Sequence, residues 1–149
     1  MSIKEKLKTD LITAMKAKEQ SRVDCIRFIN AAIKKVEVDT RKDLDDSAVT
    51  GILMNLAKQR RDSIDQFRKG GREDLATKEE AELKLIQGYL PQQMSGEELE
   101  SLVGSVIAET GAKGMKDMGA VMKAVMAKAA GKAEGGAISE MVKKKLSQA

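Results

Sequence analysis

The sequence predicts an all-α protein made of an N-terminal four-helix unit and a small C-terminal three-helix unit. Residues that favour helices dominate the 149-residue chain, which contains a single proline. Apolar residues recur at spacings of three and four, and no stretch sustains the alternation that a half-buried strand needs. Polar breaks near residues 20–21 and 39–43, together with later glycines and Pro91, divide the chain into seven such periodic segments, so we expect seven helices.

The first two helices are expected between Ile3 and Thr40. The apolar stripe of the first helix recurs at every fourth position, at Ile3, Leu7, Leu11 and Met15. Ser21 is the expected N-cap of the second helix. The apolar face of that helix consists of Val23, Ile26, Ile29, Ile33 and Val36.

The third and fourth helices complete the N-terminal unit. Asp46 or Ser47 is expected to cap the third helix, which Gly70 and Gly71 end. Its apolar face carries Val49, Ile52, Leu53, Leu56, Ser63 and Phe67. Asp74 is the expected cap of the fourth helix, which ends at Gly88 and has its stripe at Leu75, Ala81, Leu85 and Ile86.

The only proline marks the expected domain boundary. Proline disfavours helical geometry in its predecessor and cannot donate a backbone hydrogen bond, so residues 1–90 and 91–149 are predicted to form separate domains. Ser95 and Glu98 predict a capping box at the start of the fifth helix. The sixth and seventh helices flank a glycine turn, residues 131–136. A unit of fewer than 60 residues without aromatic side chains is expected to be marginally stable.

Positive charge is concentrated in the last part of the chain. Residues 111–149 carry eight lysines against three acidic residues, whereas residues 92–110 carry four acidic residues and no basic one. The candidate RNA-binding residues are therefore Lys113, Lys116, Lys123, Lys128, Lys132, Lys143, Lys144 and Lys145. Lysine acts as a mobile point charge, which suits a phosphate backbone better than base recognition.

Several residue types that support catalysis are missing or isolated. The sequence contains no histidine, and Cys25 is its only cysteine. Without a histidine partner, Cys25 is interpreted as a small core residue and not as a nucleophile. We expect no catalytic residue, no cofactor and no metal site, and the acidic residues form no cluster that would hold a metal.

The chain shows no export or membrane signal. Its first seven residues alternate charged and apolar types, and no apolar run approaches the roughly 18 residues of a membrane span. A cytoplasmic location without membrane contact is therefore expected.

Several runs resemble the YqeY-like family over nearly the whole chain. The resemblance rests on the segments 33–39, 58–64, 71–79 and Tyr89-Leu90-Pro91. The tail, with residues 119–122, 131–135 and 142–146, also resembles the C-terminal domain of GatB, one of the subunits of the tRNA-dependent amidotransferases. That resemblance implies a helical appendage that helps hold tRNA. The sequence departs from the family pattern at Ala127, Lys132 and Glu134, where proline, arginine and aspartate are usual.

Three features have a functional and a structural interpretation. The turn that contains Gly131, Gly135 and Gly136 could present free amides to a phosphate, although a tight helix connection explains its glycines. The methionines Met115, Met118, Met122 and Met126 could form a partner groove, although their helical spacing favours core packing. Arg60 and Arg61 could form a second basic patch with Arg27 and Lys34, although acidic neighbours favour an ion-paired surface.

Three functional hypotheses follow. The leading one is a non-catalytic RNA-binding accessory module whose partner is tRNA or another folded RNA. The alternative is a protein-interaction adaptor that docks on a tRNA-charging or tRNA-amidating (amidotransferase) complex. The third, a glutamine-dependent carbon–nitrogen ligase, rests on the family label alone.

Overall fold

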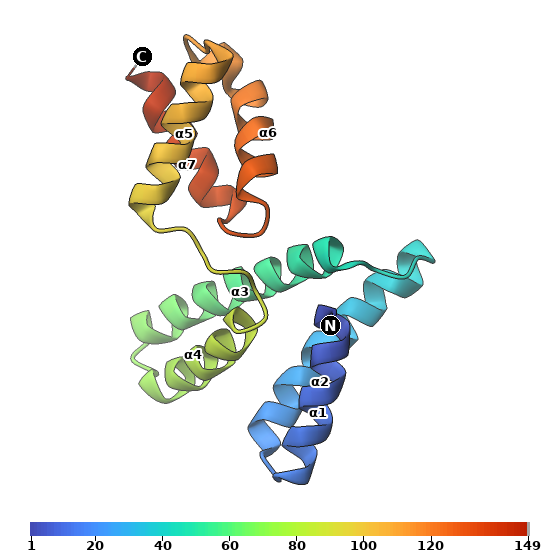
Figure 1. The fold of residues 1–149 in the computed structure, drawn as a ribbon. Coiled ribbons are helices and arrows are strands. Elements are labelled where there is room, and N and C mark those ends of the chain that lie inside the picture. Colours follow the sequence, from blue (N-terminus) through green and yellow to red (C-terminus); the bar gives the residue numbers. More distant parts are fainter. Residues whose placement is uncertain (149) are drawn as a thin grey trace. The chain divides into compact units, whose positions relative to one another are not determined.

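A computed structural model describes residues 1–148, and this part of the chain contains seven α-helices, one short 3-10 helix and no strand (Figure 1). The prediction of an all-α fold is confirmed. The structure divides into two compact units, Met1–Leu90 and Pro91–Ala149, which we describe separately.

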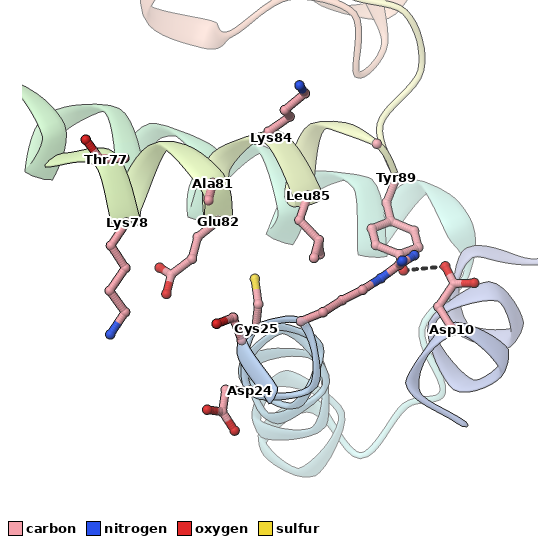
Figure 2. Close-up of a pocket in the computed structure, with 13 residues that line it drawn as sticks. Asp10, Asp24, Cys25, Thr77, Lys78, Ala81, Glu82, Lys84, Leu85 and Tyr89 are labelled. Atoms are coloured by element: carbon pink, nitrogen blue, oxygen red, sulfur yellow. Dashed lines mark hydrogen bonds between the residues drawn. The ribbon is translucent and has the colours of Figure 1, made fainter. Parts of the chain in front are cut away.

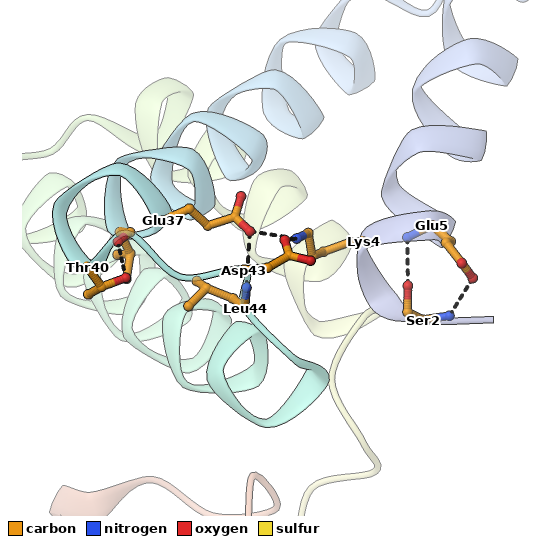
Figure 3. Close-up of polar contacts among 8 residues, drawn as sticks. Ser2, Lys4, Glu5, Glu37, Thr40, Asp43 and Leu44 are labelled. Carbon is orange, nitrogen blue, oxygen red and sulfur yellow. Dashed lines mark hydrogen bonds and ion pairs between the residues drawn. The ribbon is translucent and has the colours of Figure 1, made fainter.

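The first unit begins with an antiparallel helix pair, α1 (Ile3–Lys16) and α2 (Gln20–Thr40). Ser2 caps α1 in a reciprocal capping box with Glu5, in which each side chain accepts the other residue's backbone N–H (Figure 3). The predicted cap at Ser21 is wrong, because Lys18 adopts a positive φ of 58° and the tight turn it forms allows α2 to begin at Gln20.

The second helix pair consists of α3 (Asp46–Lys69) and α4 (Glu73–Gln87), which pack along each other. The N-cap of α3 is Asp45, so the predicted caps Asp46 and Ser47 are one and two residues too late; the Asp45 carboxylate accepts a hydrogen bond from the Ala48 N–H at 2.9 Å. Asp74 is not a cap. It lies in the first turn of α4 and pairs with Arg72 at 3.2 Å.

The core of the first unit lies where the two helix pairs meet. It is formed by Leu7, Cys25, Ile26, Ile29, Ile33, Val49, Leu53, Leu56, Ala57 and Ile86. Two residues of the predicted stripes, Met15 and Ala81, are exposed instead. The fourth helix buries the predicted Ile86 together with Ala76, while Leu75 and Leu85 are half-buried.

Several polar contacts connect helices of the first unit, and two clusters among them have a partly or largely buried cation, Lys4 or Arg60. In the first, the Lys4 ammonium contacts Glu37 and Asp43, each at 2.6 Å, and Glu37 also accepts the Leu44 N–H at 3.1 Å (Figure 3). These contacts join the start of α1 to the end of α2 and to the loop that follows. The Asp43 and Glu37 hydrogen bonds raise the pKa of Lys4.

The second cluster, which we call the Arg60 cluster, consists of Phe28, Arg60, Glu79 and Glu82. The Arg60 side chain is only 14% exposed and pairs with Glu79 at 3.2 Å and Glu82 at 2.9 Å. Its guanidinium also lies over the Phe28 ring, 4.6 Å from the centroid. This one side chain therefore connects α2, α3 and α4, and the ion-paired interpretation of Arg60 is confirmed.

The second unit contains α5 (Gly96–Thr110), the 3-10 helix η1 (Met115–Asp117), α6 (Met118–Ala129) and α7 (Gly135–Ser147). Each α-helix packs against the other two. Their aliphatic core consists of Leu99, Val103, Val106, Val121, Val125, Ala129, Ile138, Val142 and Leu146.

Local signals at both ends of α5 agree with the sequence. The Ser95 hydroxyl accepts the N–H of Glu98 at 3.1 Å, and Gly111 ends the helix with a φ of 68°. The Glu98 carboxylate accepts a hydrogen bond from the Ser95 hydroxyl at 3.2 Å. The predicted capping box requires a bond to the Ser95 backbone N–H instead, so it is only half formed.

None of the helices between residues 1 and 148 combines the length and apolar character needed to cross a membrane.

Candidate nucleic-acid interface

The candidate lysines lie on α6, on α7 and in the segments that precede and join these helices. Lys113 and Lys116 come before α6, Lys123 and Lys128 belong to α6, Lys132 lies in the turn, and Lys143–Lys145 belong to α7. Lys123 is two residues from both Val121 and Val125, which are buried, so it lies on the outer side of α6. Lys144 lies on the outer side of α7 for the same reason, between Val142 and Leu146.

Two of the eight lysines pair with acidic residues of α5. Lys128 contacts Glu109 at 2.8 Å, and Lys145 contacts Glu100 at 2.7 Å. The hydrogen bond from Lys145 lowers the pKa of the Glu100 carboxyl. Sequence reasoning could not separate these two lysines from the others, because both carboxylates are more than 15 residues away.

The other six lysines are exposed, and residues 1–148 provide no ion-pair partner for them (Lys113, Lys116, Lys123, Lys132, Lys143 and Lys144). Because α5 carries all four acidic residues of segment 92–110, the second unit has one acidic helix and two basic ones. The free ammonium groups occupy several separate positions on α6, α7 and their connections. That arrangement suits an extended polyanion better than a single small anion.

The glycine turn has a structural role at Gly131, whose φ is 76°. Its carbonyl accepts the Gln93 side-chain amide at 2.8 Å, and the Lys132 carbonyl accepts the Met94 N–H at 2.7 Å. These contacts attach the turn to the segment before α5. Gly135 and Gly136 form the first residues of α7 and have no positive φ. The turn is therefore explained by the helix connection, and we assign it no ligand.

The four methionines divide into two groups. Met118 and Met122 are half-buried and pack on the aliphatic core, as their spacing predicted. The core prediction is wrong for Met115 and Met126, which are 48% and 51% exposed. Met126 directly follows the buried Val125, so its side chain is turned about 100° from the core-facing direction.

The first unit contains an open pocket of about 840 Å³ between the α1–α2 pair and α4. Figure 2 shows Cys25 directed from α2 toward Ala81 and Leu85, with Tyr89 closing one end. The Tyr89 hydroxyl donates a hydrogen bond to Asp10 of α1. The sequence did not reveal this pocket, because its two sides, residues 10–25 and 77–89, are more than 50 positions apart. The only local signal was the single tyrosine before Pro91.

Neither the Cys25 thiol nor the Tyr89 hydroxyl in this pocket is activated near neutral pH. Burial raises the pKa of the Cys25 thiol to about 11, with a further contribution from the nearby Glu82. Burial and the hydrogen bond to Asp10 also raise the pKa of Tyr89. The thiolate is the nucleophilic form of cysteine, so Cys25 remains in its unreactive form, as expected for a core residue. No group of three or more potential metal-ligating His, Cys, Asp or Glu side chains occurs within residues 1–148.

Comparison with known proteins identifies the family. The model of the YqeY-like protein family matches residues 4–146. The chain belongs to the YqeY-like family. The resemblance seen in the sequence is thus confirmed for the family, whereas the likeness of the tail to GatB stays a prediction.

The YqeY-like protein is also similar to several fungal proteins named "Altered inheritance of mitochondria protein 41, mitochondrial". The protein of Eremothecium gossypii is 48% identical over 85 residues, which cover 56% of this chain and 46% of the relative. The protein of Lachancea thermotolerans is 40% identical, and the match covers 69% of this chain and 57% of the relative. The protein of Pyrenophora tritici-repentis is 34% identical over 150 aligned residues, which cover 96% of this chain and 78% of the relative. The matches with the first two span about half the length of those relatives.

These names contradict the expected cytoplasmic location, because all three relatives are named as mitochondrial proteins. The expectation was wrong because it rested on the lack of an apolar signal-peptide core. That criterion concerns secretion and does not address transport into an organelle.

Proposed function

We propose that this YqeY-like protein is a non-catalytic accessory module that binds a folded RNA, with tRNA as the first ligand to test. The observation that supports it is the set of six exposed lysines without ion-pair partners in the second unit, on the side of α6 and α7. Neutralising phosphates with lysines releases counterions, which favours binding.

The composition of the second unit favours backbone recognition over reading of bases. Residues 91–149 contain no arginine and no aromatic side chain. The unit therefore lacks the arginine fork that best reads guanine and the rings on which unpaired bases stack. A folded RNA recognised by its shape and backbone is the ligand that this surface fits.

The contrast between free and paired lysines provides a matched test. Changing Lys123 and Lys144 to Gln removes two charges that form no ion pair, one from each of α6 and α7; Lys144 contributes to the lowered pKa of Glu100 only after the Lys145 hydrogen bond. Changing Lys128 and Lys145 to Gln removes the same charge from the same helices, but from the lysines that pair with Glu109 and Glu100. We expect the first variant to lower the logarithmic salt slope of tRNA binding by about 1.4 to 1.8, and the second to lower it by less than half as much.

The measurement is a fluorescence-anisotropy titration of the full chain with labelled tRNA at several salt concentrations. Because the relatives are named as mitochondrial, both a bulk cytosolic and a mitochondrial tRNA pool are used. Lack of binding to both pools at low salt contradicts the proposal. Co-purification of a tRNA-charging or amidating enzyme that survives nuclease and high salt supports the adaptor alternative instead.

A further inference from the structure

The exposed face of α2 carries a second group of cations. Arg27, Ala31, Lys34 and Val38 follow one another at spacings of four, three and four, with Lys35 beside them, and all five are exposed. We call these five residues the α2 face. The opposite side of the helix is the buried stripe of Val23, Ile26, Ile29 and Ile33. The α2 face is therefore directed away from the core of the first unit.

The net positive charge of the first unit lies in its first 42 residues, which include both α1 and α2. Residues 1–42 carry 11 Lys and Arg against six Asp and Glu, whereas residues 43–90 carry eight against ten. Among the described residues, no carboxylate forms an ion pair with Arg27, Lys34 or Lys35. The hydrogen bonds with Lys4 and Glu37 lower the pKa of the Asp43 carboxyl, and Lys34 contributes to this shift at a distance. The acidic residues Asp24 and Asp39 lie toward the two ends of the face, and Asp24 accepts a hydrogen bond from Gln20.

The spacing of these cations fits an extended anion. Arg27 and Lys34 are seven residues apart, which places them about two turns or 10 Å apart along the axis. Side chains at that spacing on a straight helix surface do not converge on one point, as ligands of a small anion must. They can each contact a different phosphate of one backbone.

The apolar residues of α2 favour an RNA over a membrane surface. Helices that lie on membranes insert a broad apolar face beside their cations. The exposed large apolar residues of α2 are Phe28, at 46%, and Val38, at 62%. Arg60 covers one side of the Phe28 ring, so Val38 remains as the main group available for insertion.

We propose that the α2 face is a second contact surface for the phosphate backbone of a folded RNA. This inference rests on the proposed function and adds a site in the first unit that contributes arginine as well as lysine. Each of the two units then carries a basic contact surface. Two weak contacts on one chain act together, because the first raises the effective concentration of the second.

The test compares two triple variants of the full chain with labelled bulk tRNA. In the first, Arg27, Lys34 and Lys35 are changed to Gln. In the control, Lys58, Lys69 and Lys84 are changed to Gln; these exposed lysines lie on α3 and α4 and have the same total charge. We expect the first variant to bind at least tenfold more weakly at about 50 mM salt and to lose roughly 2 to 3 from the logarithmic salt slope. The control should change affinity less than threefold. Circular dichroism of both variants checks that helix content is retained.

The outcomes separate this inference from the proposed function. If the unchanged protein binds no tRNA, the proposed function fails and the inference fails with it. If the protein binds tRNA and the affinity depends on Lys123 and Lys144, but the α2 variant and its control bind tRNA equally well, only the inference is overturned. A parallel titration with phosphatidylserine vesicles tests the membrane alternative: loss of vesicle binding with unchanged tRNA binding in the α2 variant also overturns it.

Discussion

The two units of this protein stabilise a helical bundle in different ways. The first unit adds polar contacts between helices to its apolar core, through Lys4, Arg60 and Tyr89. The second relies on an aliphatic core of nine buried residues, two Lys–Glu pairs and the contacts of Gln93 and Met94 with the glycine turn. As a result, the first unit holds a largely buried cation, Arg60, whereas the paired lysines of the second unit, Lys128 and Lys145, are more exposed.

The largest effect is expected from truncating the core of the second unit by Ile138→Ala. Ile138 is 2% exposed, and removing a buried Ile side chain costs about 2–4 kcal/mol. A single core in a unit this small rarely supplies more than about 3–5 kcal/mol. We therefore expect the second unit to unfold while the first remains folded, which two-phase thermal unfolding and tryptic cleavage near the tail lysines would detect.

The matched control for this prediction is Ile12→Ala on α1, where the side chain is already 48% exposed. It should change stability by less than about 1 kcal/mol. A single cooperative loss of both units in the Ile138 variant would contradict the independence of the two domains.

An intermediate effect is expected from Arg60→Met, which breaks the Arg60 cluster. The change leaves Glu79 and Glu82 facing the interior without their cation. Fully buried pairs cost about 3–5 kcal/mol to break, and the partial exposure of these carboxylates reduces our expectation to about 1–3 kcal/mol. Urea unfolding of the first unit provides the measurement.

Arg68→Met is the control for the Arg60 variant. Arg68 also pairs with two glutamates, Glu73 and Glu80, but its side chain is 44% exposed. An exposed pair contributes about 0–1 kcal/mol, so this variant should be nearly unchanged. Equal destabilisation by the two substitutions would show that burial of the Arg60 cluster is unimportant.

The smallest effect is expected from Tyr89→Phe, which removes the hydrogen bond to Asp10 and should cost about 0.5–1.5 kcal/mol at neutral pH. Burial raises the folded-state pKa of Tyr89 above its ordinary value of 10.0. The folded protein then holds this proton more tightly than the unfolded chain, so the stabilisation is complete below pH 10 and is lost as the pH rises above it.

Urea unfolding between pH 9 and 11 should consequently show a steeper loss of stability in the unchanged protein than in the Tyr89→Phe variant. Cys25 titrates in the same range, with a pKa of about 11, so both proteins are also compared in a Cys25→Ala background. If the free energy of unfolding depends on pH in the same way with and without the Tyr89 hydroxyl, the titration of Tyr89 is not the cause of the loss of stability.

The sequence by itself determined the seven helices and most of their ends. Ser95 and Gly111 illustrate why: a cap and a positive-φ glycine act on the backbone groups of neighbouring residues, so their effect is visible in a short window. Local signals were insufficient at Ser21 and Asp74: a tight turn at Lys18 lets α2 begin at Gln20, and α4 begins at Glu73 with Asp74 already inside its first turn.

Tertiary structure alone decided which side chains remain available to a partner. The pairing of Lys128 and Lys145, the exposure of Met126 and the burial of Arg60 depend on how each helix is rotated against its neighbours. That rotation is set by packing between residues far apart in sequence. Helical periodicity within one segment gives no information on such contacts. The charge of the tail was therefore evident from its composition, but the division into six free lysines and two paired ones required the fold.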